Sequence, residues 1–259
     1  MAAADREQRS SRLAAWSAGL SSLSVPVLVI TAIGHRSRLL DADSTYASMA
    51  AGFTLAGLAV IVAVAAFANI WQDGRRGAGR ALRGLLVGLL VLSFPGYAAW
   101  KLVSEPRLTD ISTALDEPPR FRRARPDRQS GEARSRIPGE LEADLQRKAH
   151  PDLVSRFYPV GTPRVFEEVE AIVRRRGWEV VLENAPDEDD QTGRIEAVAI
   201  TLVFGFRQDV VIRVAPEGDG AVVDMRSVAR NAAHDLGTNA SRIRSFLAKL
   251  DSALQGVTS

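Results

Sequence analysis

The chain has 259 residues, of which 46% are hydrophobic, and its 33 basic and 31 acidic residues leave a formal net charge of +2. So small a net charge is not typical of a nucleic-acid-binding protein, and no nucleic acid is expected as a partner. The absence of cysteine excludes disulfides, thiolate zinc sites and cysteine nucleophiles. Nearly all long charge-free stretches lie before Lys101, so we expect a membrane half and an aqueous half.

Three segments of the first hundred residues are long and apolar enough to cross a bilayer. Spanning about 30 Å of hydrocarbon takes roughly 20 helical residues, because only a helix satisfies its own backbone polar groups there. We therefore predict a membrane domain over residues 1–103, with transmembrane helices at about 13–33, 48–70 and 84–100. Pro95 and Gly96 predict a kink or a frayed last turn in the third helix.

The first segment has a second interpretation as a cleaved signal peptide, because Arg6, Arg9 and Arg12 precede its apolar core. Its apolar run is longer than the core of such a peptide, and no A-x-A-like cleavage site follows it. A transmembrane helix is therefore the favoured interpretation.

Basic residues near helix ends tend to stay in the cytoplasm, so their distribution predicts the orientation. Seven lie in the N-terminal tail and the second loop, against four in the first loop and after the third helix. Counting Arg120, Arg122 and Arg123 as well makes the two sides equal. On the shorter count, we expect a multi-pass protein of the bacterial cytoplasmic (inner) membrane with a cytoplasmic N-terminus and an extracytoplasmic C-terminal domain.

Small residues recur at a four-residue spacing in the second and third segments: Gly52 with Ala56, Ala59 with Ala63, and Gly84 with Gly88. This spacing allows helices to approach closely, either within one chain or in a dimer, and packing within one chain is favoured. The predicted spans contain no Asp, Glu, Lys, Arg or His, which counts against a transporter, a proton relay or a channel.

Residues 104–150 are predicted to form a linker without a packed core. They contain five prolines, few apolar residues and a basic run at 120–128. The positive charge of this segment would attract anionic lipid headgroups, whereas the alternative is a solvated tether with no specific partner. A short helix is predicted within it at 139–149.

Residues 151–259 are predicted to form a soluble α+β domain. Strands are expected at 155–160, 178–183, 195–204, 210–214 and 222–228, between turns rich in Asp, Gly and Pro. One helix is expected from Pro163 to Gly177 with Thr162 as its N-cap, and another from Ala240 to Leu254 with Asn239 as its N-cap. This order predicts a meandering antiparallel sheet of four to five strands with both helices on one face.

Alternation along two of these strands places Arg213, Asp224 and Arg226 on the other face of the sheet, with Glu196 as a further candidate. One interpretation is a set of cross-strand ion pairs on a solvated surface. The functional interpretation is a polar binding face.

A second candidate cluster lies in residues 227–244, before and within the start of the last helix. The free N–H groups of a helix N-terminus favour an anion, but Asp235 and Asn239 are equally typical of helix capping. His234 is far in sequence from the other histidines, so no metal and no cofactor are expected. No catalytic residue is assigned, and the candidate binding residues of both clusters are Arg213, Asp224, Arg226, Ser227, Arg230, His234, Asp235, Asn239 and Arg242.

The chain resembles the bacterial domain-of-unknown-function family 1499 over about 150 residues that begin at Asp110. The resemblance is carried by the segments DISTALDEPPRF, RRRGWEVV, IEAVAITLVFGFRQDVVIRV, VVDMRSVAR and HDLGTNASRIRSFL. It implies N-terminal membrane helices and no established activity. The chain departs from the family pattern at Gln208, where members often have an acidic residue, and at 229–232.

The favoured functional hypothesis is a non-catalytic envelope protein whose extracytoplasmic domain binds a partner protein, a lipid headgroup or a small anion. The chain has no nucleophile elbow, Walker loop or dinucleotide fingerprint. The alternative is a hydrolase-like enzyme with Asp224, Asp235 or His234 as acid or base, and with Arg226 and Arg230 binding an anion. Membrane transport is a third hypothesis. The expected partners are the lipid bilayer and either an envelope protein or an anionic lipid headgroup.

Overall fold

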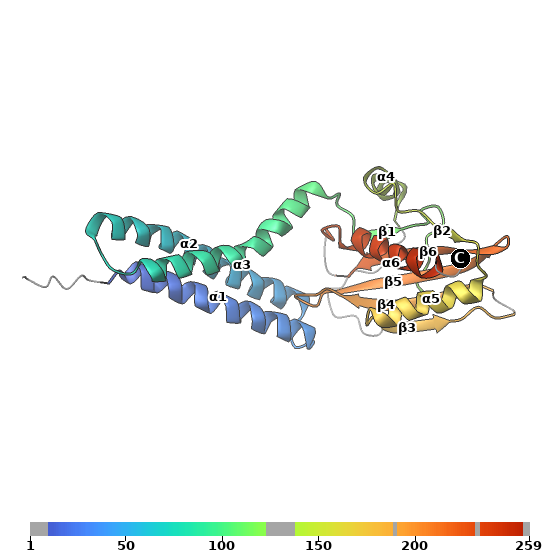
Figure 1. The fold of residues 1–259 in the computed structure, drawn as a ribbon, viewed down its shortest axis with the longest axis horizontal. Helices are drawn as coiled ribbons and strands as arrows, with labels where there is room; N and C mark the ends of the chain where they lie inside the picture. The colour runs from blue at the N-terminus through green and yellow to red at the C-terminus, as the bar shows by residue number, and fades with distance from the viewer. Residues whose placement is uncertain (1–9, 123–137, 189–190, 231–233, 256–259) are drawn as a thin grey trace, which may run out of the picture. The chain divides into compact units, whose positions relative to one another are not determined.

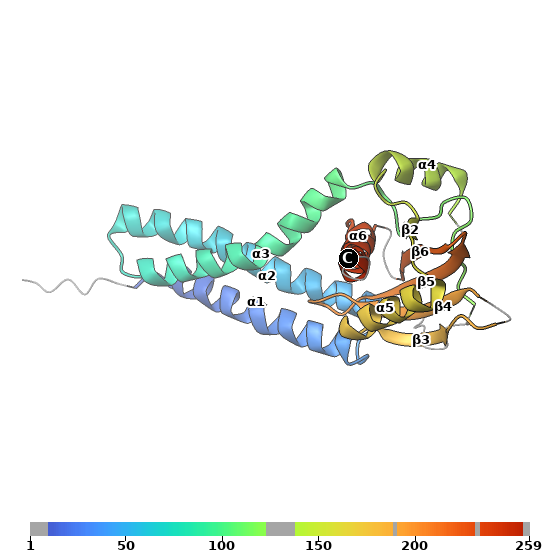
Figure 2. The same ribbon diagram turned by 45° about the vertical axis from the view of Figure 1, so that its right-hand side comes forward.

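The computed structural model describes residues 10–122, 138–188, 191–230 and 234–255. The chain forms two compact units, Met1–Trp100 and Lys101–Ser259 (Figures 1 and 2). Arg6, Arg9 and most of the basic run at 120–128 lie outside the described residues, so the interpretations that rest on them stay predictions.

The first unit is helical, as its apolar segments predict. Its helices are α1 (Arg12–Arg36), α2 (Ala42–Asp73) and α3 (Ala78–Ser104). Each is long and apolar enough to cross a membrane. Helix α3 continues through Pro95, and Figure 1 shows it bent part-way along its length, in agreement with the predicted kink.

Small residues hold the three helices close together. The Ser17 hydroxyl of α1 donates a hydrogen bond of 2.8 Å to the Ala59 carbonyl of α2. A Cβ atom added at Gly84 of α3 would lie 1.9 Å from Ser17 Oγ, and one added at Gly52 of α2 would lie 2.6 Å from Leu28 Cδ2 of α1. The four-residue spacing of small residues therefore serves packing within one chain.

Substitution of Gly84 by Ala tests this packing. Gly84→Ala is expected to destabilise the first unit by about 1 to 3 kcal/mol, because the new methyl group overlaps Ser17. Gly57→Ala is the matched control, since nothing lies within 4 Å of a Cβ atom at that position. Unfolding of the full-length protein in mixed detergent micelles, titrated with sodium dodecyl sulfate, measures both. Equal midpoints for the two variants would contradict the packing.

The second unit is built on one antiparallel sheet. The strands seen in the described residues are β1 (Asp110–Ser112), β2 (Arg156–Tyr158), β3 (Glu179–Asn184), β4 (Gly193–Ile200), β5 (Arg207–Glu217) and β6 (Gly220–Ala229). Strands β3 to β6 form a meander in chain order. The other edge of β6 pairs with β1 near its C-terminal end and with β2 near its N-terminal end.

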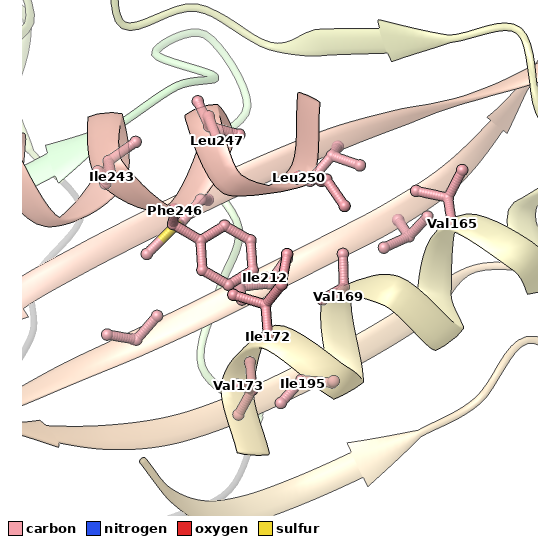
Figure 3. Close-up of a cluster of buried hydrophobic side chains, with 14 of the residues drawn as sticks. Val165, Val169, Ile172, Val173, Ile195, Ile212, Ile243, Phe246, Leu247 and Leu250 are labelled. Atoms are coloured by element: carbon pink, nitrogen blue, oxygen red, sulfur yellow. The ribbon is translucent and has the colours of Figure 1, made fainter. Parts of the chain in front are cut away.

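Two helices cover one face of this sheet, as predicted. They are α5 (Thr162–Arg175) and α6 (Thr238–Gln255). Figure 3 shows their apolar side chains, among them Val169, Ile172 and Phe246, packed over Ile195 and Ile212 of the strands. Each fully buried aliphatic or aromatic side chain contributes about 1.5 to 3 kcal/mol, so this layer is the main source of stability. The predicted α+β fold class is confirmed.

Much of the segment predicted as a linker, residues 104–150, is part of the second unit. Residues 110–112 form β1, and residues 140–149 form the predicted short helix, α4 (Glu140–Ala149). Leu108 and Ile111 are buried in the core of the sheet. The hydrophobic pattern does not reveal this, because most of the contacts made by residues 113–122 come from main-chain groups rather than from apolar side chains.

Neither residue predicted as an N-cap occupies that position in the structure. Helix α6 is capped by Asp235, whose carboxylate accepts hydrogen bonds of 2.9 Å from the N–H groups of Gly237 and Asn239. Asn239 therefore lies inside the helix rather than at its cap. Helix α5 likewise includes Thr162, and Gly161 precedes it.

Candidate functional site

The nine candidate residues lie on both sides of the sheet rather than in one pocket. In the β5–β6 register Arg213 lies opposite Asp224 and Val211 lies opposite Arg226, whereas Ser227 lies opposite Val210. Because neighbouring residues of a strand point to opposite faces, Arg226 points away from the helices and Ser227 points towards them. The second group also contains Asn239 and Arg242 of α6, with His234 and Asp235 in the loop before that helix.

The face of the sheet opposite the helices is polar, as the alternation predicts, but it is not solvated. Glu196 is 0% exposed and Arg226 is 1% exposed. Residues 113–122, which we call the covering segment, run over this face. Arg226 Nη1 donates to the Pro119 carbonyl at 3.2 Å, and the Arg122 N–H donates to Glu196 Oε1 at 2.5 Å. The predicted solvated surface is therefore an interior layer.

Three arginines of this polar face each form an ion pair with a carboxylate: Arg226 with Asp110, Arg230 with Asp209, and Arg213 with Asp224. The first pair has fork geometry, with distances of 2.8 Å from Nε to Oδ1 and 2.5 Å from Nη2 to Oδ2. The second pair has fully buried side chains on both sides. Because the charges are already neutralised inside the protein, this network is structural.

The Arg226–Asp110 pair is testable by a double-mutant cycle. Arg226→Met is expected to destabilise the second unit by about 3 to 5 kcal/mol, because the Asp110 carboxylate stays buried without its partner. Adding Asp110→Asn should restore part of that loss, so the two effects are less than additive. Chemical unfolding of the full-length protein gives both values. Arg164→Met, which breaks an exposed ion pair, should stay within about 0.5 kcal/mol of the native protein. Strictly additive effects would show that the two side chains are not coupled.

Arg242, on the helix side, has a different environment. Its Nη1 donates to Ser227 Oγ at 3.1 Å and to Asn239 Oδ1 at 3.0 Å, and both acceptors are neutral. Within the described parts of the chain, Arg242 forms no ion pair with a carboxylate. The pKa of Arg242 is lowered to about 10, mainly by burial of the guanidinium. The charge of Asp235 opposes this shift, and the like charge of Arg176 adds to it.

Arg176, which follows α5, is the second arginine of this kind. Its guanidinium lies 5.5 Å from the centre of the Trp178 ring and 5.6 Å from that of Phe246, and its Nη1 donates to Ser245 Oγ at 3.1 Å. Burial lowers its pKa from the usual value. No carboxylate that the structure describes pairs with it either. We call Arg176 and Arg242 the arginine pair.

The sequence did not single out Arg176. It belongs to a run of three arginines at the end of α5, and basic residues are common there because they complement the helix dipole. Only the position of its guanidinium above Trp178 and beside Ser245 distinguishes it from its neighbours.

His234 and Asp235 have structural contacts. The Leu236 N–H donates to His234 Nδ1 at 2.9 Å, so the ring proton lies on Nε2, which is 3.1 Å from the Glu105 carbonyl and donates to it. Asp235 caps α6, and burial raises its pKa. In the described ranges, no group of three His, Asp or Glu side chains is arranged to hold a metal ion.

A pocket of about 350 Å³ lies elsewhere in the second unit, and Asp116, Arg147 and His150 line part of it. It includes none of the candidate residues. Arg147 is already paired with Asp116 and with Asp144. His150 is 6% exposed, with its Nδ1 3.2 Å from Arg244 Nη2 and its Nε2 3.9 Å from Glu105 Oε2.

His150 makes the stability of the second unit dependent on pH. Burial and the charge of Arg244 lower the pKa of His150 below its usual value of 6.5, against the opposing effects of Glu105, Asp152 and Asp235. The unfolded chain therefore takes up a proton at a higher pH than the folded one, and stability is expected to fall as the pH drops from about 7 to 5. His150→Gln should reduce this loss in chemical unfolding measured across that range. Identical pH profiles for the native protein and His150→Gln would contradict the assignment.

Residues 110–250 match a family model described as a protein of unknown function (DUF1499). The chain belongs to this family. The resemblance predicted from the sequence is thereby confirmed over nearly the range expected. The DUF1499 region begins at the first residue of β1 and ends within α6, so it includes the covering segment, the polar network and the arginine pair. No curated protein matches the chain.

Proposed function

We propose that the chain is a membrane-anchored protein whose DUF1499 domain binds a phosphate-type oxyanion at the arginine pair. The observation that carries the proposal is the environment of Arg242, which is partly buried and whose hydrogen bonds go to neutral oxygens. The proposal includes an anchor in a bacterial inner membrane, and the seven-to-four count of basic residues supports a domain outside the cytoplasm.

A guanidinium that is partly removed from water without a carboxylate in direct contact is unfavourable. An oxyanion relieves this cost, because charge-assisted hydrogen bonds are about twice as strong as neutral ones and the guanidinium fork matches phosphate geometry. Ser227 and Asn239 use only Nη1 of Arg242 among the bonds that the described residues make to it. Arg176 adds a second positive charge, which repels Arg242 until an anion binds between them.

The N-terminus of α6 is capped from within the chain, which is one of the two interpretations that the sequence left open. Asp235 already accepts hydrogen bonds from the N–H groups of Gly237 and Asn239. We therefore assign anion binding to the side chain of Arg242, in the second turn of α6, rather than to the end of the helix.

The hydrolase alternative has no supporting geometry among the described residues. Asp224 is held by Arg213 and by the hydroxyl of Ser155, while Asp235 caps a helix and His234 uses both ring nitrogens. The arginines proposed to bind an anion for that reaction, Arg226 and Arg230, have carboxylate partners.

Oxyanion binding is testable with the full-length protein in nanodiscs. In phosphatidylcholine nanodiscs, calorimetric titration with inorganic phosphate measures a free anion. Nanodiscs that also contain phosphatidylglycerol present a lipid headgroup, and bound headgroup should compete with the added phosphate. Arg242→Gln and Arg176→Gln should each weaken binding by about tenfold, as expected for loss of a charged hydrogen bond. Arg164→Gln makes the same charge change on the exposed side of α5 and should have no effect.

The two arms separate the two sources of phosphate. Phosphate binding that phosphatidylglycerol does not reduce identifies a soluble ligand, whereas competition identifies a lipid headgroup, and either result supports the site. Thermal unfolding of each variant checks that it is folded. An affinity for phosphate that is unchanged in Arg242→Gln, or absent from the native protein in the first arm, would overturn the proposal.

A further inference from the structure

The loop that joins β4 to β5 exposes apolar side chains. In residues 200–206, which we call the apolar loop, Leu202 is 90% exposed, Val203 is 51% exposed and Ile200 is 43% exposed. An exposed apolar group of this kind marks a surface for a partner or for a membrane.

The main chain of the apolar loop is hydrogen-bonded within the loop. The Thr201 N–H donates to the Phe206 carbonyl at 2.9 Å, and the Gly205 N–H donates to the Thr201 carbonyl at 3.2 Å. The Phe206 N–H donates to Thr201 Oγ1 at 2.8 Å. Gly205 has a φ of +74°, which allows this tight turn. These hydrogen bonds lower the cost of moving the three N–H groups into an apolar layer.

The register of the sheet places the apolar loop at the end of the sheet where β1 begins, and β1 is the first strand after α3. Gln208, just after the loop, pairs with Ala229, and the neighbouring Val228 pairs with Asp110. The apolar part of α3 ends at Lys101, so the nine residues from there to Asp110 reach about 30 Å at most. The chain itself therefore limits the distance between Asp110 and the apolar part of α3.

The arginine pair belongs to the same end of the unit. Gln208 Nε2 donates to Thr238 Oγ1 at 2.9 Å, which links the base of the apolar loop to the first residue of α6. Arg242 lies one turn further along that helix. Cationic side chains beside an exposed apolar tip are typical of surfaces that bind a bilayer containing anionic lipids.

We infer that this end of the second unit rests on the lipid bilayer, with Leu202 and Val203 inserted at the boundary between headgroups and acyl chains. A lipid surface is favoured over a protein partner because of the short tether, the hydrogen bonds within the loop and the adjacent cations. The inference stands on the apolar loop and is independent of whether the arginine pair binds phosphate.

The chain has no cysteine, so a single introduced cysteine can be labelled uniquely. Leu202→Cys carries a nitroxide label on the loop. Asp219→Cys, in the exposed turn between β5 and β6 at the other end of the sheet, is the control. In full-length protein in nanodiscs that contain phosphatidylcholine and phosphatidylglycerol, the label at 202 should collide more with oxygen than with a water-soluble nickel complex. The label at 219 should show the opposite preference.

Two results would overturn the inference. One is a label at 202 that is as accessible to the nickel complex as the label at 219. The other is dipolar coupling between labels at 202 in nanodiscs with two copies, which would identify a second copy of the chain as the occupant. Repeating the measurement in Arg242→Gln separates the two proposals, because the apolar loop should still insert when phosphate binding is lost.

Discussion

Arg226 is almost completely removed from water, and the arrangement of the second unit depends on how its charge is neutralised. Its carboxylate partner, Asp110, lies on β1, directly after the segment that leaves α3. The Pro119 carbonyl and the ring of Phe121 complete its environment. Because a buried charge must be paired and hydrogen-bonded, this guanidinium helps to hold β1 and the covering segment on the sheet, together with the β1–β6 pairing and the Arg122–Glu196 hydrogen bond.

The first unit also pairs its buried polar groups, and it does so by hydrogen bonds rather than by ion pairs. Its buried hydroxyl groups bind main-chain carbonyls, as Ser17 does across helices and as Ser24 and Thr31 do within α1. Close packing of Gly and Ala then brings the helices together where the bilayer provides no hydrophobic driving force between them. The buried polar groups named here are therefore paired inside the protein in both units.

Arg242 differs from the paired arginines of the polar face, and this difference is the most informative feature of the DUF1499 domain. The arginines of the polar face are neutralised by carboxylates, whereas the described contacts of Arg242 are to neutral oxygens. At the same end of the sheet, the apolar loop exposes Leu202. We propose an anion as the ligand of the first feature and lipid as the contact of the second.

The sequence by itself determined three helices long and apolar enough to cross a membrane, the order of strands β2 to β6, the core faces of α5 and α6, and membership of the family from Asp110 onward. These features follow from local patterns, namely long apolar runs and the alternation of apolar residues at helical or strand spacing. It also placed Arg213, Asp224 and Arg226 on one face. Only the tertiary structure decided that this face is covered, that Asp110 is the partner of Arg226, and that Arg176 lies near Arg242. These contacts join residues up to 116 positions apart through ion pairs and main-chain groups, which leave no periodic signal in the sequence.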